Sequence, residues 1–173
     1  MSTAGEALIA AAVIGVGATA LMDLWAFARQ RLSGVPPLDF ALVGRWLGWM
    51  PRGRFRHAPI AASPAVGGEK AIGWTAHYLT GIAFAGVLLA IAGPGWACAP
   101  TLVPALAVGV GTVAAPFLLM QPGMGAGLAA RRTPDPAAAR RRSLTAHAVF
   151  GLGLYLAAWM AKLAGLLPPG LCG

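Results

Sequence analysis

Four long apolar stretches constrain the fold of this chain more than any other feature of its sequence. They cover residues 7–27, 72–92, 102–120 and 144–167, and each is long enough to cross about 30 Å of hydrocarbon as a helix. Only 10% of the 173 residues are charged, whereas soluble domains average about a quarter. The sequence therefore predicts an all-α integral membrane protein, with residues 1–173 forming one domain of four transmembrane helices.

Two short motifs recur along these stretches. Residues 75–81 (TAHYLTG) and 145–151 (TAHAVFG) share the pattern T-A-H-x-x-x-G, and GVG occurs at both 15–17 and 109–111. The repeats predict that the four helices form two duplicated pairs. His77 and His147 would then occupy equivalent positions in the two pairs.

The placement of the basic residues predicts the orientation in the membrane. The net charge is +8, and twelve of the thirteen Lys and Arg residues lie between the first and second spans or between the third and fourth. The second loop and both chain ends carry none. Because basic loops stay in the cytoplasm, we expect both termini and the short second loop on the outer side of the membrane. Arginines so close to membrane ends are expected to contact anionic lipid headgroups rather than nucleic acid.

The first basic loop contains its own helical pattern. Residues 38–50 follow proline and have apolar positions at helical spacing, with Trp46, Trp49 and a single base, Arg45. This pattern is typical of a short interfacial helix with indoles at headgroup depth. Arg45 is expected to extend toward the headgroups.

The candidate site consists of ionisable residues on helix faces rich in small residues. Asp23 ends a row of small residues spaced four apart, and Glu69, His77 and His147 lie on similar rows in the second and fourth helices. Small residues allow close helix contact, and ionisable groups inside a membrane usually have a function. We expect Asp23, His77 and His147 to converge near the cytoplasmic ends of the helices, with Glu69 next to them.

Four interpretations of this cluster remain open. Two imidazoles with carboxylates suit Zn, Fe or Mn, and His77 with His147 could instead hold a b-type haem. The cluster could also exchange protons in a small-solute transporter, or it could only fasten helices together. Whether the chain is an enzyme stays open, because no residue set indicates nucleophilic catalysis. A homo-oligomer is possible as well.

The only two cysteines are Cys98, in the second loop, and Cys172, next to the C-terminus. The charge pattern assigns both to the outer side of the membrane, which in a bacterium is the oxidising periplasm, where disulfides form. The sequence therefore allows a Cys98–Cys172 bridge, with two free thiols as the alternative.

Several longer stretches carry a family resemblance: ATALMDLW at 18–25, GRWLG at 44–48, GRFRH at 53–57, GWTAHYLTGIAFA at 73–85, PFLLMQPGMGAG at 116–127 and FGLGLY at 150–155. In these stretches the chain resembles bacterial multi-pass membrane proteins catalogued as domain of unknown function 2938. The resemblance implies a location in the bacterial inner membrane, where both termini would face the periplasm. It implies no activity and no catalytic residues.

Overall fold

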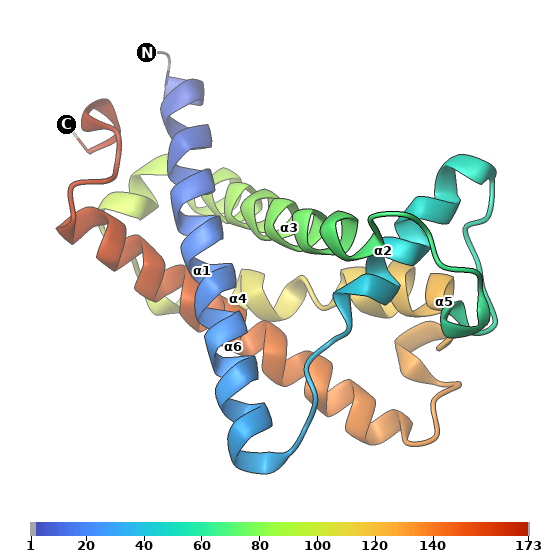
Figure 1. Cartoon of the computed structure of the whole chain (residues 1–173). Helices are drawn as coiled ribbons and strands as arrows, with labels where there is room; N and C mark the ends of the chain where they lie inside the picture. Colours follow the sequence, from blue (N-terminus) through green and yellow to red (C-terminus); the bar gives the residue numbers. More distant parts are fainter. Residues whose placement is uncertain (1–2, 173) are drawn as a thin grey trace. The chain divides into compact units, whose positions relative to one another are not determined.

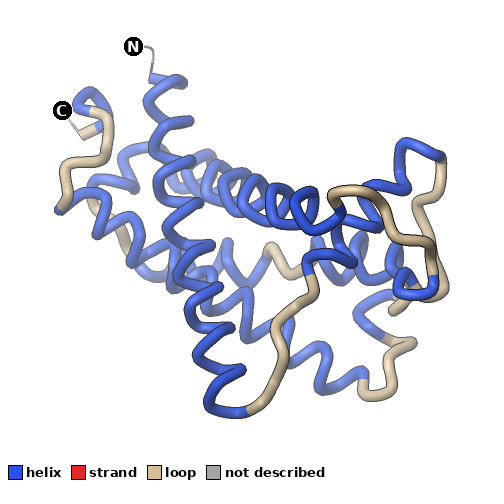
Figure 2. The backbone as a smooth tube through the Cα atoms, in the orientation of Figure 1, coloured by secondary structure: helices blue, strands red, loops and turns tan. Residues whose placement is uncertain are grey.

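In a computed structural model that describes residues 3–172, the chain is mainly helical, and the described residues contain no strand (Figures 1 and 2). Within this range, four segments are helical, long and apolar enough to cross a membrane: Ala4–Ser33, Glu69–Ala92, Leu102–Met124 and Pro136–Leu163. The predicted class, an all-α protein with four transmembrane helices, is therefore confirmed.

The helices differ in detail from the predicted stretches. Helix α1 covers Thr3–Ser33, α3 covers Glu69–Ala92 and α6 covers Pro136–Leu163. At 31 residues, α1 is about 46 Å long, which exceeds the hydrocarbon thickness. The fourth helix ends before residue 167 because the chain turns at Gly165, whose φ of +66° is left-handed.

The third span is interrupted. Helix α4 covers Leu102–Gly111, a π-helical turn follows at Pro116–Met120, and α5 covers Gln121–Met124. Pro116 has no N–H group to donate to the carbonyl of Thr112, four residues earlier. The Ala115 N–H donates to the Thr112 carbonyl instead, at 3.0 Å, so the helix changes its hydrogen-bond pattern at this point.

The contacts of the chain define two compact units. The first, here called the disulfide unit, comprises residues 3–36, 78–111 and 146–172; the second, the arginine unit, comprises residues 37–77 and 112–145. Helices α3 and α6 each contribute to both units. The boundary falls between His77 and Tyr78 in α3, and between Thr145 and Ala146 in α6.

The core of the disulfide unit is built around close contacts between glycines. A Cβ atom on Gly15 of α1 would overlap the backbone of α3 at Gly81 and Ile82, and a Cβ atom on Gly109 of α4 would overlap the backbone of α6 at Gly151. These are the glycines of the two repeated motifs. Both helix pairs, α1 with α3 and α4 with α6, therefore meet at equivalent positions, as two duplicated pairs require.

The arginine unit contains the short helix expected in the first loop. Helix α2 covers Phe40–Trp49, and the side chain of Asp39 caps it by accepting a hydrogen bond from the Ala41 N–H at 2.9 Å. Helix α2 crosses the start of α3 where Gly44 meets the backbone of Glu69. A Cβ atom at residue 44 would overlap that backbone, so this crossing requires glycine.

Candidate functional site

Asp23 lies inside the first span and is hydrogen-bonded to the second span. The Tyr78 hydroxyl of α3 donates to Asp23 Oδ2 at 3.1 Å, within the disulfide unit. The contact follows from the nearby Gly15–Ile82 approach: Asp23 lies two turns beyond Gly15, and Tyr78 lies one turn before Ile82 on the antiparallel helix. The glycine contact thus brings a carboxylate and a phenol together between two helices that are apolar enough to span a membrane.

Thr19 lies between the glycine contact and Asp23 on α1. It is only 1% exposed, and its hydroxyl donates to the Gly15 carbonyl at 2.8 Å. This bond satisfies the buried hydroxyl within its own helix. The row of small residues that points to Asp23 therefore ends in a tight contact between α1 and α3, as the sequence pattern predicts.

His147 lies in α6, half-buried, against helix α4. Its Nδ1 lies 3.3 Å from the carbonyl oxygen of Gly109. A carbonyl oxygen only accepts hydrogen bonds, so Nδ1 carries the proton in this contact. The second helix pair therefore has an imidazole at its glycine contact, whereas the first pair has the Thr19 hydroxyl.

His77 belongs to the arginine unit and lies among aromatic rings. Its ring centroid is 4.2 Å from that of Phe40 with the planes tilted by 31°, and 5.8 Å from that of Trp74 in an edge-on arrangement. These distances are typical of packed aromatic rings. His77 and His147, equivalent in sequence, thus have different surroundings within their own units.

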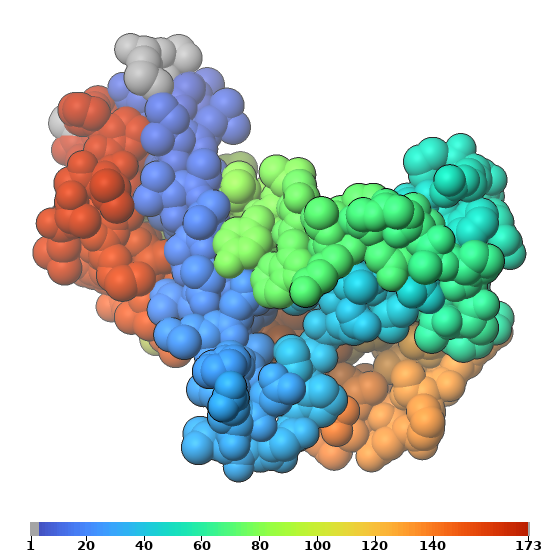
Figure 3. All heavy atoms as spheres, in the orientation of Figure 1, coloured from blue at the N-terminus to red at the C-terminus, as the bar shows by residue number. Residues whose placement is uncertain are grey.

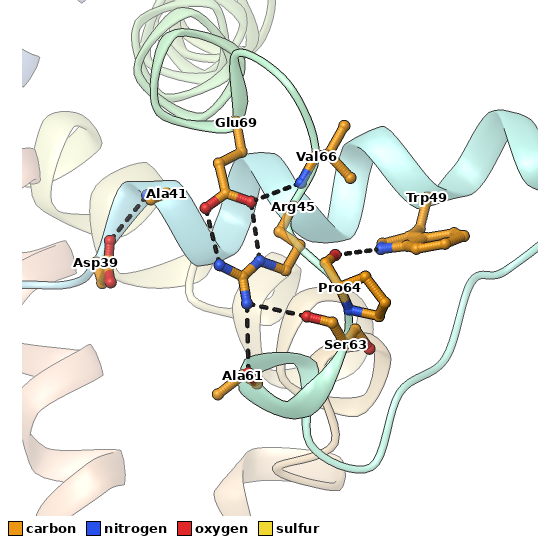
Figure 4. A network of polar contacts seen from close by, with 9 residues as sticks. All are labelled: Asp39, Ala41, Arg45, Trp49, Ala61, Ser63, Pro64, Val66 and Glu69. Carbon is orange, nitrogen blue, oxygen red and sulfur yellow. Dashed lines mark hydrogen bonds and ion pairs between the residues drawn. The ribbon is translucent and has the colours of Figure 1, made fainter.

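Glu69 is bound by Arg45. Two hydrogen bonds of 2.8 Å join the guanidinium to the two carboxylate oxygens, from Nε to Oε2 and from Nη2 to Oε1 (Figure 4). The Val66 N–H also donates to Oε2, at 3.0 Å. Contrary to the expectation that Arg45 reaches lipid headgroups, its charge is therefore paired inside the protein, and Glu69 raises the pKa of Arg45 above its ordinary value through these hydrogen bonds.

The rest of the Arg45 side chain anchors the first loop. Its Nη1 donates to the carbonyls of Ala61 at 3.3 Å and Ser63 at 3.1 Å (Figure 4). One arginine therefore connects α2, the loop at 61–66 and the first residue of α3. Arginine can make this many contacts because its planar guanidinium carries five N–H donors.

The structure therefore gives each of the four predicted site residues a neighbour: Tyr78 for Asp23, Arg45 for Glu69, Phe40 for His77 and Gly109 for His147. Among residues 3–172, no three His, Cys, Asp or Glu side chains are grouped as metal ligands. Convergence of Asp23, His77 and His147 stays a prediction, and the metal and haem interpretations rest on the sequence alone.

Sequence reasoning missed two contacts of polar side chains in the arginine unit. His57 is 8% exposed, and its Nδ1 lies 2.7 Å from the Ser63 hydroxyl; Gln121 donates from Nε2 to the Ser143 hydroxyl at 3.2 Å. His57 could not be singled out, because it lies in a loop without periodicity. Its burial arises from the fold of the loop, where the backbone N–H of His57 donates to the Gly123 carbonyl at 2.9 Å.

Cys98 and Cys172 form a disulfide in the disulfide unit, with their Cα atoms 5.5 Å apart. Cys98 ends the 3-10 turn Pro94–Cys98, and Cys172 follows the turn Pro169–Leu171. Gly170 of the second turn also lies against the carboxylate of Glu6 in α1. The bridge therefore ties the C-terminal tail to the loop between α3 and α4.

The fold and these contacts define a multi-pass helical membrane protein with ionisable groups inside its spans. The family model described as "Protein of unknown function (DUF2938)" matches residues 12–161. The chain therefore belongs to this family, as its sequence motifs suggest. No curated protein and no solved structure matches the chain.

Proposed function

We propose that this protein is a small-solute transporter of the bacterial inner membrane in which Asp23 carries a proton. The observation that carries the proposal is the Asp23–Tyr78 pair, a carboxylate within the first span hydrogen-bonded by a hydroxyl of the second. Carboxylates inside membranes are costly and commonly mark proton pathways. Asp23 binds a proton on one side of the membrane and releases it on the other as the solute crosses.

Two features of the fold support transport over a purely structural role. The duplicated helix pairs run in the same direction, and parallel repeats of this kind are one of the common designs of transporters. The third span is interrupted at residues 112–120, and interrupted helices and π-helical turns are frequent at binding sites. Only the first helix pair carries this carboxylate. In the second pair, Phe117 occupies the position that corresponds to Asp23, eight residues after the first glycine of the repeated motif.

The disulfide supports the orientation that this proposal requires. Both of its cysteines lie next to segments without basic residues, and a stable bridge needs an oxidising compartment. The periplasm provides one. Both termini and the loop between α3 and α4 then face the periplasm, while the two arginine-rich loops face the cytoplasm.

The proposal is tested by solute-evoked proton movement in proteoliposomes loaded with a pH-sensitive dye. Amino acids, small carboxylic acids and inorganic cations are added in turn. We expect at least one class to move protons with the native protein and not with Asp23→Asn. Asparagine keeps an acceptor for the Tyr78 hydroxyl, so this variant removes proton binding while preserving the helix contact.

Two further variants separate transport from a structural role. Asp39→Asn removes a carboxylate from the cap of α2, where asparagine serves equally well, and it should leave proton movement intact. Tyr78→Phe keeps the carboxylate and should keep coupling. The proposal would be contradicted if Asp23→Asn moved protons as well as the native protein does. It would also be contradicted if the native protein moved no protons with any solute class.

A further inference from the structure

The arginine unit carries a large positive charge that the protein itself does not neutralise. Eight exposed arginines in it have no carboxylate partner among the described residues: Arg52, Arg54, Arg56, Arg131, Arg132, Arg140, Arg141 and Arg142. The chain has only five Asp and Glu side chains. Those in this unit are occupied, because Glu69 binds Arg45 and the side chains of Asp39 and Asp135 accept from backbone N–H groups.

Arg52 and Arg54 differ from the other six because both contact the same indole ring. Their guanidinium carbons lie over the Trp49 ring, 5.1 and 4.9 Å from its centroid. Contacts of this kind between a cation and an aromatic face fix the position of the charge. Gly53 between them has a φ of +74°, a left-handed conformation that suits glycine and turns the chain back toward the ring.

The indole is itself fixed by the loop that Arg45 anchors. Trp49 Nε1 donates to the Pro64 carbonyl at 3.1 Å, and Arg52 Nη1 donates to the Gly48 carbonyl at 2.9 Å (Figure 4 shows the Trp49 bond). No hydrogen bond within the described chain uses the guanidinium of Arg54. This cluster therefore presents positioned N–H donors that have no anionic partner among residues 3–172.

The residue that follows Arg54 adds an exposed apolar side chain to the same segment. Phe55 is 59% exposed, and the turquoise segment that contains it lies at the surface in the space-filling view (Figure 3). An exposed phenyl ring next to a tryptophan and two arginines is a combination typical of the membrane interface, where rings reach the acyl boundary and cations meet phosphates.

We propose that Trp49, Arg52 and Arg54 form a binding site for the phosphate of an anionic phospholipid in the cytoplasmic leaflet. The guanidinium groups donate to the phosphate oxygens, a pairing that suits the planar fork of arginine. Phe55 enters the acyl region beside the bound lipid. This site is independent of the transport proposal, since it uses neither Asp23 nor its helix pair.

The site is tested by native mass spectrometry of the full chain in detergent, with phosphatidylglycerol and phosphatidylcholine as probes. The native protein should retain phosphatidylglycerol in preference to phosphatidylcholine. The double variant Arg52→Gln/Arg54→Gln should weaken phosphatidylglycerol binding by about tenfold, because charge-assisted hydrogen bonds are lost. Excess inorganic phosphate should displace little of the lipid, since it lacks the acyl chains.

The matched control is Arg141→Gln/Arg142→Gln, which removes the same charge from the same unit but from exposed arginines that do not contact Trp49. It should weaken binding by less than about threefold, as expected for surface charge. Equal losses in the two double variants would overturn the site in favour of diffuse attraction. Complete displacement by inorganic phosphate would overturn the lipid assignment. The melting temperatures of the variants are compared as a folding control, because equal values show that each loss reflects binding.

Discussion

At the scale of single residues, the helix contacts depend on glycines that admit no side chain. A Cβ atom on Gly109 would overlap the backbone of Gly151, whereas one on Gly86 of α3 would meet nothing within 4 Å. We therefore expect Gly109→Ala to destabilise the protein by about 1–3 kcal/mol, because backbones must move apart. Gly86→Ala is the matched control and should cost nothing. The measurement is unfolding in mixed micelles; equal stability of the two variants would contradict the glycine contact.

Residue patterns predicted the contact faces of the helices better than the partners of individual side chains. The row ending at Asp23 does pack against α3, because small residues four apart leave room for a neighbouring backbone. That Tyr78 donates a hydrogen bond to Asp23 could not be predicted from that row. Tyr78 follows His77 in sequence and so points about 100° away around the helix, and the row on α1 does not indicate which residue of α3 lies opposite Asp23.

At the scale of elements, the Arg45–Glu69 pair holds the first loop against α2 and α3. Glu69→Ala removes the acceptor of Arg45 and of the Val66 N–H, so we expect the backbone of residues 61–66 to become less protected. Hydrogen exchange followed by mass spectrometry should show faster exchange there, and no change in α4. Lys70→Ala, an exposed neighbour, is the control. Unchanged exchange at 61–66 in Glu69→Ala would show that other contacts fix the loop.

The elements themselves were largely predictable, and their interruptions were not. Long apolar stretches predicted each span because a bilayer requires every backbone group to be hydrogen-bonded within a helix. The π-helical turn at Pro116–Met120 needs more than the presence of proline, since Pro104 lies within regular α4. Pro104 is in the first turn, where its missing N–H breaks no hydrogen bond. The Arg45–Glu69 pair was missed because these residues are 24 positions apart, and only the fold of the loop joins them.

At the scale of the whole molecule, the arrangement of charges and cysteines predicts one orientation. Every arginine of the chain lies on the side assigned to the cytoplasm, and the Cys98–Cys172 bridge lies with the segments assigned to the periplasm. The four spans could be predicted from the sequence, and their direction across the membrane stays a prediction. The division into two compact units could not be predicted, because it depends on how the first loop packs on the start of α3 and on α5.

Orientation is the central claim, because proton carriage by Asp23 and lipid binding by the Trp49 cluster both depend on it. An arginine-specific protease added to right-side-out spheroplasts and to inside-out vesicles tests it directly. We predict cleavage only in inside-out vesicles. Fragments cut at Arg131 should stay joined without reductant, through Cys98 and Cys172, and separate once reduced. Cleavage in spheroplasts, or fragments that separate without reductant, would contradict the account.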